Sequence, residues 1–70
     1  MMNNRVAEFR NRANLSQTDL AKLTDISLPY IKNIENPNVK TNVSIGVAYK
    51  LAKYFDTTIE TLFNLGLEDN

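Results

Sequence analysis

The apolar residues of this chain recur every three or four positions in five separate segments. Such spacing places them on one face of an α-helix, whereas a half-buried strand requires strict alternation of apolar and polar residues, which no convincing segment shows. The pattern therefore predicts an all-α fold of five short helices around one core. We expect these helices at about 4–13, 17–24, 28–36 and 44–55, with the last beginning near 57.

Serine residues before the second and third segments predict where those helices begin. Ser16 can accept a hydrogen bond from the third residue of the next helix, and Asp19 can return one, which makes a capping box. Leu15 and Leu20 form the matching hydrophobic staple. Ser27 repeats this arrangement before the third segment, so both helices have a defined start.

Two prolines limit the third segment. Pro29 lies in its first turn, where the missing N–H costs nothing. Pro37 disfavours helical geometry at Asn36, so the helix should end there. Only two residues separate the second segment from the cap Ser27, which predicts a very short turn between these helices.

The fourth and fifth segments complete the predicted domain. The apolar face of the fourth comprises Ile45, Ala48, Leu51, Ala52 and Phe55. The fifth begins at Thr57 or Thr58, with Glu60 placed for a capping box from Thr57, and Gly66 is the expected C-terminal cap. We expect residues 1–66 to form one domain and residues 67–70 to form a flexible tail.

The short turn between the second and third segments is typical of a helix-turn-helix unit, here over residues 17–36. In such a unit Leu20 and Leu23 should face the core, and the small Ala21 should lie where the helices cross. Asp25 should allow the bend, because aspartate tolerates the left-handed conformation. The second helix of the pair would be anchored by Ile26, Ile31 and Ile34.

Charge is unevenly distributed along a chain whose net charge is zero. Residues 1–53 hold all eight lysines and arginines and four acidic residues, a net charge of +4, whereas residues 54–70 hold four acidic residues and no base, a net charge of −4. A basic body can present a positive face although the total is neutral. We expect any affinity for nucleic acid to depend on salt through only a few phosphate contacts.

The composition argues against several other classes of function. The chain has no cysteine and no histidine, which removes disulfides and the commonest general base and metal ligand. The carboxylates of Glu8, Asp19 and Glu60 are explained as caps or solvated groups, so we expect no catalysis, metal or cofactor. No apolar run reaches the length of a membrane span, and the first ten residues do not resemble a signal peptide, which favours a cytoplasmic protein.

Four pieces of the sequence resemble the lambdoid phage repressor and Cro type of helix-turn-helix domain, the XRE family. They are Leu-Ser-Gln-Thr-Asp-Leu-Ala at 15–21, Ile-Ser-Leu-Pro-Tyr-Ile-Lys-Asn-Ile-Glu-Asn at 26–36, Lys-Leu-Ala-Lys-Tyr-Phe at 50–55 and Thr-Ile-Glu-Thr-Leu-Phe at 58–63. The resemblance implies a five-helix lambda-repressor-like domain that binds double-stranded DNA and regulates transcription, most simply as a repressor. It suggests no small-molecule substrate.

The resemblance also implies the residues that contact DNA. The helix at about 28–36 would enter the major groove as the recognition helix, and Gln17 would anchor a phosphate at the start of the preceding helix. Asn33 would pair with an adenine edge, and the Tyr30 hydroxyl would reach a phosphate. The full set is Gln17, Leu28, Pro29, Tyr30, Lys32, Asn33, Asn36, Lys40, Thr41, Asn42 and Ser44. An ion pair between Arg10 and Glu35 would fix the recognition helix.

The recognition helix is also where the chain departs from the family. Leu28 and Pro29 are poor hydrogen-bonding groups at positions that often read bases, which favours shape and methyl contacts. The alternative is therefore a protein-interaction module, such as an antitoxin-like or coactivator partner with little base readout. Leu65 and Leu67 lie beyond the core pattern and are candidates for contacts across a two-fold axis, in a homodimer bound to a palindromic operator.

Overall fold

The computed structural model describes residues 4–64, and these form five helices without a strand. The helices are α1 (Val6–Arg12), α2 (Gln17–Thr24), α3 (Leu28–Glu35), α4 (Ile45–Tyr54) and α5 (Ile59–Phe63). This architecture confirms the predicted all-α fold. None of these helices is long and apolar enough to cross a membrane.

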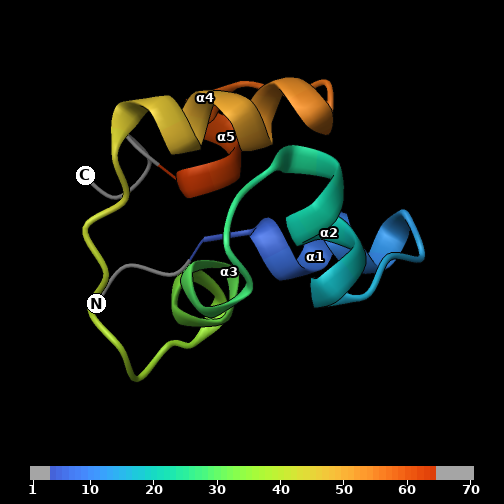
Figure 1. Ribbon diagram of the computed structural model, residues 1–70. Helices are drawn as coiled ribbons and strands as arrows, with labels where there is room; N and C mark the ends of the chain where they lie inside the picture. Colours follow the sequence, from blue (N-terminus) through green and yellow to red (C-terminus); the bar gives the residue numbers. More distant parts are fainter. Residues whose placement is uncertain (1–3, 65–70) are drawn as a thin grey trace.

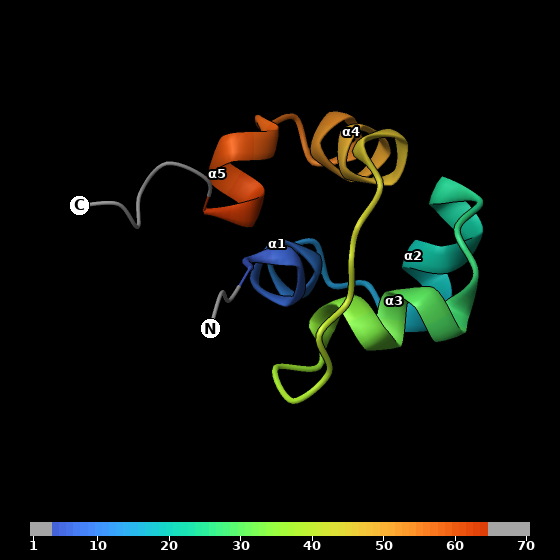
Figure 2. The same ribbon diagram turned by 90° about the vertical axis from the view of Figure 1, so that its left-hand side faces the viewer.

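The helices form two groups around the core (Figure 1). α2 packs against α3, and α1 also contacts α3, while α4 packs against α5. In a view turned by 90°, α4 lies above and α3 below, and the segment that joins them crosses the front of the molecule (Figure 2). The helix-turn-helix unit therefore leaves one side of α3 uncovered.

Hydroxyl groups cap the helices largely as the sequence predicts. The Ser16 hydroxyl accepts a hydrogen bond from the Asp19 N–H at 2.9 Å, and the Ser16 N–H donates to the Asp19 carboxylate at 3.0 Å, which completes the capping box. Ser27 caps α3 by accepting from the Tyr30 N–H. α5 is capped by Thr58, so the capping box expected from Thr57 is not the one used.

Asparagine and aspartate turn the chain at the helix ends. Asn14, Asp25, Asp56 and Asn64 all have φ between 57° and 60°, a left-handed conformation in which short polar side chains are tolerated. Asp25 therefore allows the bend between α2 and α3 as expected. The predicted cap at Gly66 is wrong, because α5 ends at Phe63 and Asn64 is its cap. Gly66 and the predicted tail, residues 67–70, lie outside the described residues.

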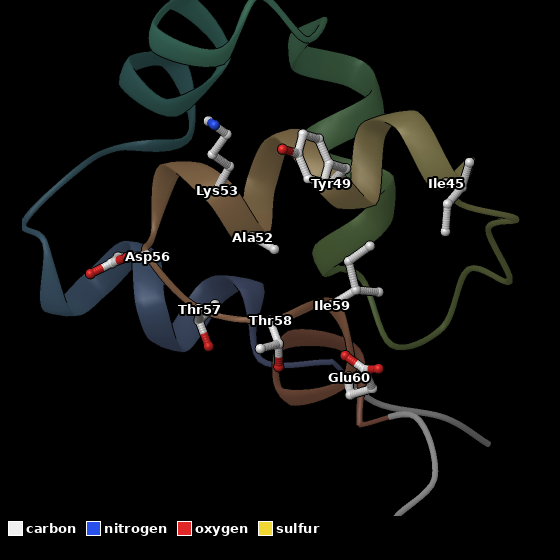
Figure 3. Close-up of a pocket in the computed structure, with 9 residues that line it drawn as sticks. All are labelled: Ile45, Tyr49, Ala52, Lys53, Asp56, Thr57, Thr58, Ile59 and Glu60. Atoms are coloured by element: carbon white, nitrogen blue, oxygen red, sulfur yellow. The ribbon is translucent and has the colours of Figure 1, made fainter.

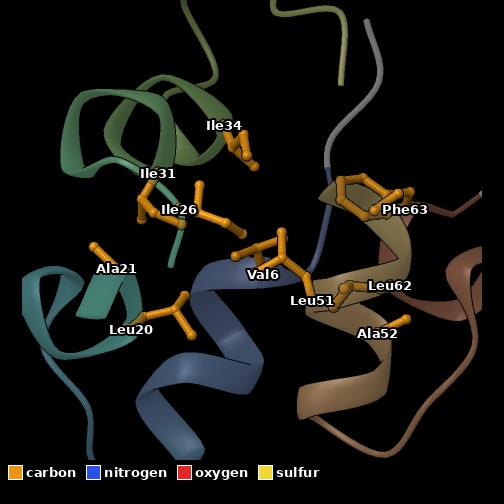
Figure 4. Close-up of a cluster of buried hydrophobic side chains, with 11 residues drawn as sticks. Val6, Leu20, Ala21, Ile26, Ile31, Ile34, Leu51, Ala52, Leu62 and Phe63 are labelled. Carbon is orange, nitrogen blue, oxygen red and sulfur yellow. The ribbon is translucent and has the colours of Figure 1, made fainter. Parts of the chain in front are cut away.

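The core combines side chains from all five helices and from the turn between α2 and α3 (Figure 4). Its buried apolar members are Val6, Leu20, Ala21, Ile26, Ile31, Ile34, Ala48, Leu51, Ala52, Leu62 and Phe63. The isoleucines expected to anchor α3 are all buried. This core holds α3 from its inner side.

The predicted burial of one leucine and one isoleucine is wrong. Leu23 was expected in the core but is 55% exposed, because Thr24 takes the buried position one turn after Leu20 and donates its hydroxyl proton to the Leu20 carbonyl at 2.7 Å. Ile45 was expected on the core face of α4 but is 75% exposed. It is the first residue of the helix, at the edge of that face.

Candidate nucleic-acid interface

The exposed side of α3 carries polar residues backed by a rigid apolar side. Ile31 and Ile34 are buried, whereas Lys32 and Asn33 between them are exposed. Pro29, in the first turn, and Asn36, the C-cap, are exposed as well. Leu28 is only partly accessible, because it packs against the core. The outer surface of α3 can therefore offer amide and ammonium groups to a ligand.

A partly buried charge network joins α3 to the two preceding helices. Arg10 of α1 donates two parallel hydrogen bonds, of 2.8 and 2.9 Å, to the Glu35 carboxylate. Its guanidinium donates a third, of 2.8 Å, to the Leu15 carbonyl. The Arg10 and Glu35 side chains are only 14% and 6% exposed. The hydrogen bonds to Glu35 raise the pKa of Arg10 above its usual range. Such a bidentate pair fixes geometry as well as charge.

Gln17 belongs to the same network, which the sequence did not reveal. Its amide Nε2 donates to the Glu35 carboxylate at 3.0 Å, so the residue expected to anchor a phosphate is already oriented by the last residue of α3. The side-chain oxygen of Gln17 accepts no hydrogen bond among the described residues. Gln17 and Glu35 are 18 positions apart in the sequence, so no pattern of neighbouring residues predicts this hydrogen bond.

The segment after α3 is tied back to that helix by two hydroxyl groups. The Tyr30 hydroxyl donates to the Asn42 carbonyl at 3.5 Å and accepts from the Ser44 N–H at 3.3 Å. The Thr41 hydroxyl donates to the Asn33 carbonyl at 3.3 Å. The Tyr30 hydroxyl, which is predicted to reach a phosphate, thus also positions this segment.

All of the predicted DNA-binding residues except Gln17 lie on one continuous part of the chain, residues 28–44. Four exposed members belong to α3 and its cap, while Lys40, Thr41, Asn42 and Ser44 follow in the segment that Tyr30 and Thr41 hold. Gln17 is joined to this group through Glu35. Hydrogen bonds thus link Gln17, Thr41, Asn42 and Ser44 to residues of α3.

Lys32 and Lys40, on α3 and in the segment after it, differ from the arginines in having no acidic partner within the described residues 4–64. Arg5 and Arg12 both pair with Glu8, and Arg10 pairs with Glu35. Lys32 and Lys40 form no ion pair within these residues and are exposed. Lysine ammonium groups in such positions can neutralise phosphate. No cluster of acidic side chains in the described part could hold a metal ion.

The sequence model of the helix-turn-helix family matches residues 6–62, which include every described helix except the last residue of α5. The chain belongs to the XRE family of helix-turn-helix proteins. This family is one of DNA-binding transcription regulators, and the lambda-repressor-like arrangement of five helices agrees with it.

Relatives of known sequence cover nearly the whole chain. An uncharacterized HTH-type transcriptional regulator of Archaeoglobus fulgidus is 37% identical over 62 residues, which are 89% of this chain and 84% of that protein. Another from Methanocaldococcus jannaschii is 39% identical over 89% of this chain and 91% of its own length. The HTH-type transcriptional regulator SinR of Bacillus licheniformis is 30% identical over 91% of this chain and 57% of its own length.

A further positioning contact escaped the sequence analysis. The side-chain amide of Asn4 donates to the Ile34 carbonyl at 2.9 Å, while its oxygen accepts from the Val6 N–H at 3.0 Å. Asn4 therefore links the start of α1 to the last turn of α3. Its partner Ile34 is 30 residues distant, so no pattern of neighbouring residues indicates it.

Proposed function

We propose that this family member is a sequence-specific DNA-binding transcriptional regulator of the Cro or repressor type. The observation that carries the proposal is the exposed side of α3, where Lys32 and Asn33 project from a helix that is buried behind them and fixed by Glu35. A rigid helix with polar side chains on its free side is what major-groove readout requires. The relatives named HTH-type transcriptional regulators support the same role.

Within this proposal the residues have different tasks. Asn33 pairs with an adenine edge and Lys32 binds a guanine or a phosphate, while Pro29 and the accessible part of Leu28 contact thymine methyl groups. Lys40 and the segment that follows it lie along the phosphates. Gln17, held by Glu35, contributes at the positive N-terminus of α2, where phosphate is favoured.

The proposed functional unit is a homodimer on a palindromic operator, with the two copies of α3 about 34 Å apart on one side of the DNA. The proposed role requires neither catalysis nor a cofactor. Its proposed setting is the cytoplasm.

Fluorescence anisotropy with labelled duplexes tests the proposal. Sites are first selected from a random DNA pool, and the purified chain is then titrated with the selected site and with random DNA. We expect Asn33→Ala to weaken binding to the selected site by about 5- to 150-fold, since a bidentate base contact contributes about 1–3 kcal/mol of discrimination. Binding to random DNA should change little, because it rests on phosphate contacts.

A matched variant separates base readout from a general loss of affinity. Asn11→Ala removes another exposed amide, from α1, and should leave both affinities unchanged. Equal weakening on both DNAs by Asn33→Ala would assign Asn33 to the backbone. If no duplex binds in a salt-dependent manner at low ionic strength, DNA binding is excluded and the protein-interaction module becomes the better hypothesis.

A further inference from the structure

The C-terminal end of α3 lacks a common type of helix cap. The last four carbonyls of a helix have no partner inside it, and a glycine in the left-handed conformation just after the C-cap commonly helps to direct two N–H groups back to them. In this chain the C-cap is Asn36, which is extended at φ −87° and ψ 112°, and Pro37 follows it. Proline has no N–H and a fixed negative φ, so a glycine-type cap cannot form here.

Two carbonyl groups of α3 therefore lack the donors that a glycine-type cap would give them. In such a cap the N–H of position 37 would bind the Ile34 carbonyl, and the N–H of position 38 would bind the Asn33 carbonyl. Pro37 has no N–H to give, and the Asn38 N–H donates to the side-chain oxygen of Asn36 at 2.9 Å. A carbonyl that neither water nor a donor reaches costs stability, and Ile34 is only 5% exposed. Its carbonyl needs a donor from elsewhere.

Side chains from outside the helix supply one donor to each of these carbonyls. The Asn4 amide donates from Nδ2 to the Ile34 carbonyl at 2.9 Å, and the Thr41 hydroxyl donates to the Asn33 carbonyl at 3.3 Å. The Asn33 carbonyl also accepts from the Asn36 N–H at 3.2 Å. In the part of the chain that the structure describes, the Ile34 carbonyl has Asn4 alone. Asn4 is therefore the main substitute for the missing cap.

The oxygen of the Asn4 side chain ties it to the start of α1. Oδ1 accepts a hydrogen bond from the Val6 N–H at 3.0 Å, which leaves the amide nitrogen to face α3. Val6 is fully buried, and its side chain belongs to the same core as that of Ile34 (Figure 4). Asn4 thus joins the last turn of α3 to a well-packed part of the molecule. A side chain held in this way can set the direction of a helix as well as cap it.

We propose that Asn4 is a positioning residue of α3, whose amide replaces the glycine-type cap and holds the last turn of the helix against α1. The consequence for DNA rests on the proposed function. Lys32 and Asn33 lie within the last four residues of α3, so a tilt of this end moves their side chains relative to the base edges. Hydrogen bonds tolerate little displacement of that kind. The cap itself can be tested without DNA.

Asn4→Asp separates the cap of α3 from the start of α1. The carboxylate keeps an acceptor for the Val6 N–H, and its charge suits a helix N-terminus, but at neutral pH it has no proton to donate to the Ile34 carbonyl. We expect urea unfolding to show an unfolding constant raised about tenfold, as for an unpaired carbonyl near the core. The control Lys53→Gln changes the net charge by the same amount in the hollow between α4 and α5 (Figure 3). It should change the constant less than about twofold.

A glycine at position 37 should make the amide of Asn4 dispensable. Pro37→Gly restores an N–H and permits the left-handed conformation, so the Ile34 carbonyl gains a donor from the adjoining backbone. In this background Asn4→Asp should raise the unfolding constant less than about threefold. Because each comparison is made within one background, the extra freedom that glycine gives to the unfolded chain cancels.

Discrimination between DNA sequences is the property that a purely structural role of Asn4 would leave unchanged. At a temperature where circular dichroism shows Asn4→Ala to be folded, we expect its affinity for the selected site to fall at least about threefold, a part of the discrimination that base contacts provide. Its affinity for random DNA, and the dependence of that affinity on salt, should not change, because both rest on phosphate contacts.

Three results would overturn the role of Asn4. They are an unchanged stability of Asn4→Asp, an equal cost of Asn4→Asp with proline and with glycine at position 37, and an unchanged discrimination by folded Asn4→Ala. If no duplex binds, the two stability measurements still decide the cap, and only the proposed function fails. If the unchanged chain discriminates between duplexes but Asn4→Asp costs no stability, the inference fails and the proposed function stands.

Discussion

At the scale of single residues, Asp19 links the start of α2 to the ionisation of a carboxyl group. Its carboxylate accepts the Ser16 N–H at 3.0 Å, and it lies in the first turn, where the helix dipole favours negative charge. The hydrogen bond from the Ser16 backbone is the main cause that lowers the pKa of Asp19 below its usual range. The charged form therefore stabilises the folded state.

We predict that Asp19→Asn reduces stability in a pH-dependent manner. Because the pKa of Asp19 is lower in the folded state, its contribution is fully present above the pKa of the unfolded chain and is lost as the pH falls through the folded value. Urea unfolding should therefore separate the variant from the unchanged chain at pH 7 and bring the two together at strongly acidic pH. A difference that stays constant over this range would show that the charge of Asp19 contributes nothing.

The residues that sequence reasoning located correctly act through near neighbours. Ser16 and Asp19 are three positions apart, and Asp25 needs only its own tolerance of a left-handed backbone. The prediction for Leu23 is wrong because a leucine three positions after Leu20 fits the apolar spacing of a core helix. Thr24 is buried there because its hydroxyl donates a hydrogen bond to the Leu20 carbonyl. The spacing of apolar residues does not predict the burial of a polar residue whose hydrogen bond lies within its own helix.

At the scale of helices, Glu35 connects three of them. It ends α3 and accepts hydrogen bonds from Arg10 of α1 and Gln17 of α2. The resemblance to the XRE family supplied the partner Arg10, but the position of Gln17 depends on how α2 crosses α3. Local signals therefore predicted the helix boundaries, while the contacts that orient α3, including those of Asn4 and Tyr30, required the fold.

We predict that Glu35→Gln lowers the free energy of unfolding by about 2–4 kcal/mol, because it removes the charge that compensates the largely buried Arg10. Urea unfolding at neutral pH measures the loss. Glu8→Gln is the matched control, since Glu8 also contacts two basic residues, Arg5 and Arg12, but at the surface; its effect should be far smaller, as is usual for exposed pairs. Similar losses in the two variants would contradict the role of burial.

At the scale of the whole molecule, the fold divides the basic residues into two sets. The arginines of the described chain are each paired with a glutamate, Arg5 and Arg12 with Glu8 and Arg10 with Glu35. The lysines form no ion pair among residues 4–64, so they carry the positive field that the net charge of zero conceals. The sequence revealed the uneven distribution of charge, but only the structure shows which cations are free.

This division predicts how the affinity for DNA depends on salt. Each phosphate contact releases a counterion, so the logarithm of the binding constant should fall with the logarithm of salt concentration at a slope of about −0.9 per contact. Lys40→Ala should weaken binding about equally on selected and random DNA and reduce the magnitude of the slope by about 1. Arg12→Ala removes a charge of the same sign from a side chain that is 61% exposed but paired with Glu8, and it should leave the slope unchanged. Anisotropy titrations at several salt concentrations compare the two variants.

Two outcomes would contradict this prediction. An unchanged slope for Lys40→Ala would show that Lys40 does not contact a phosphate. An equal reduction of the slope for Arg12→Ala would show that free and paired cations contribute alike.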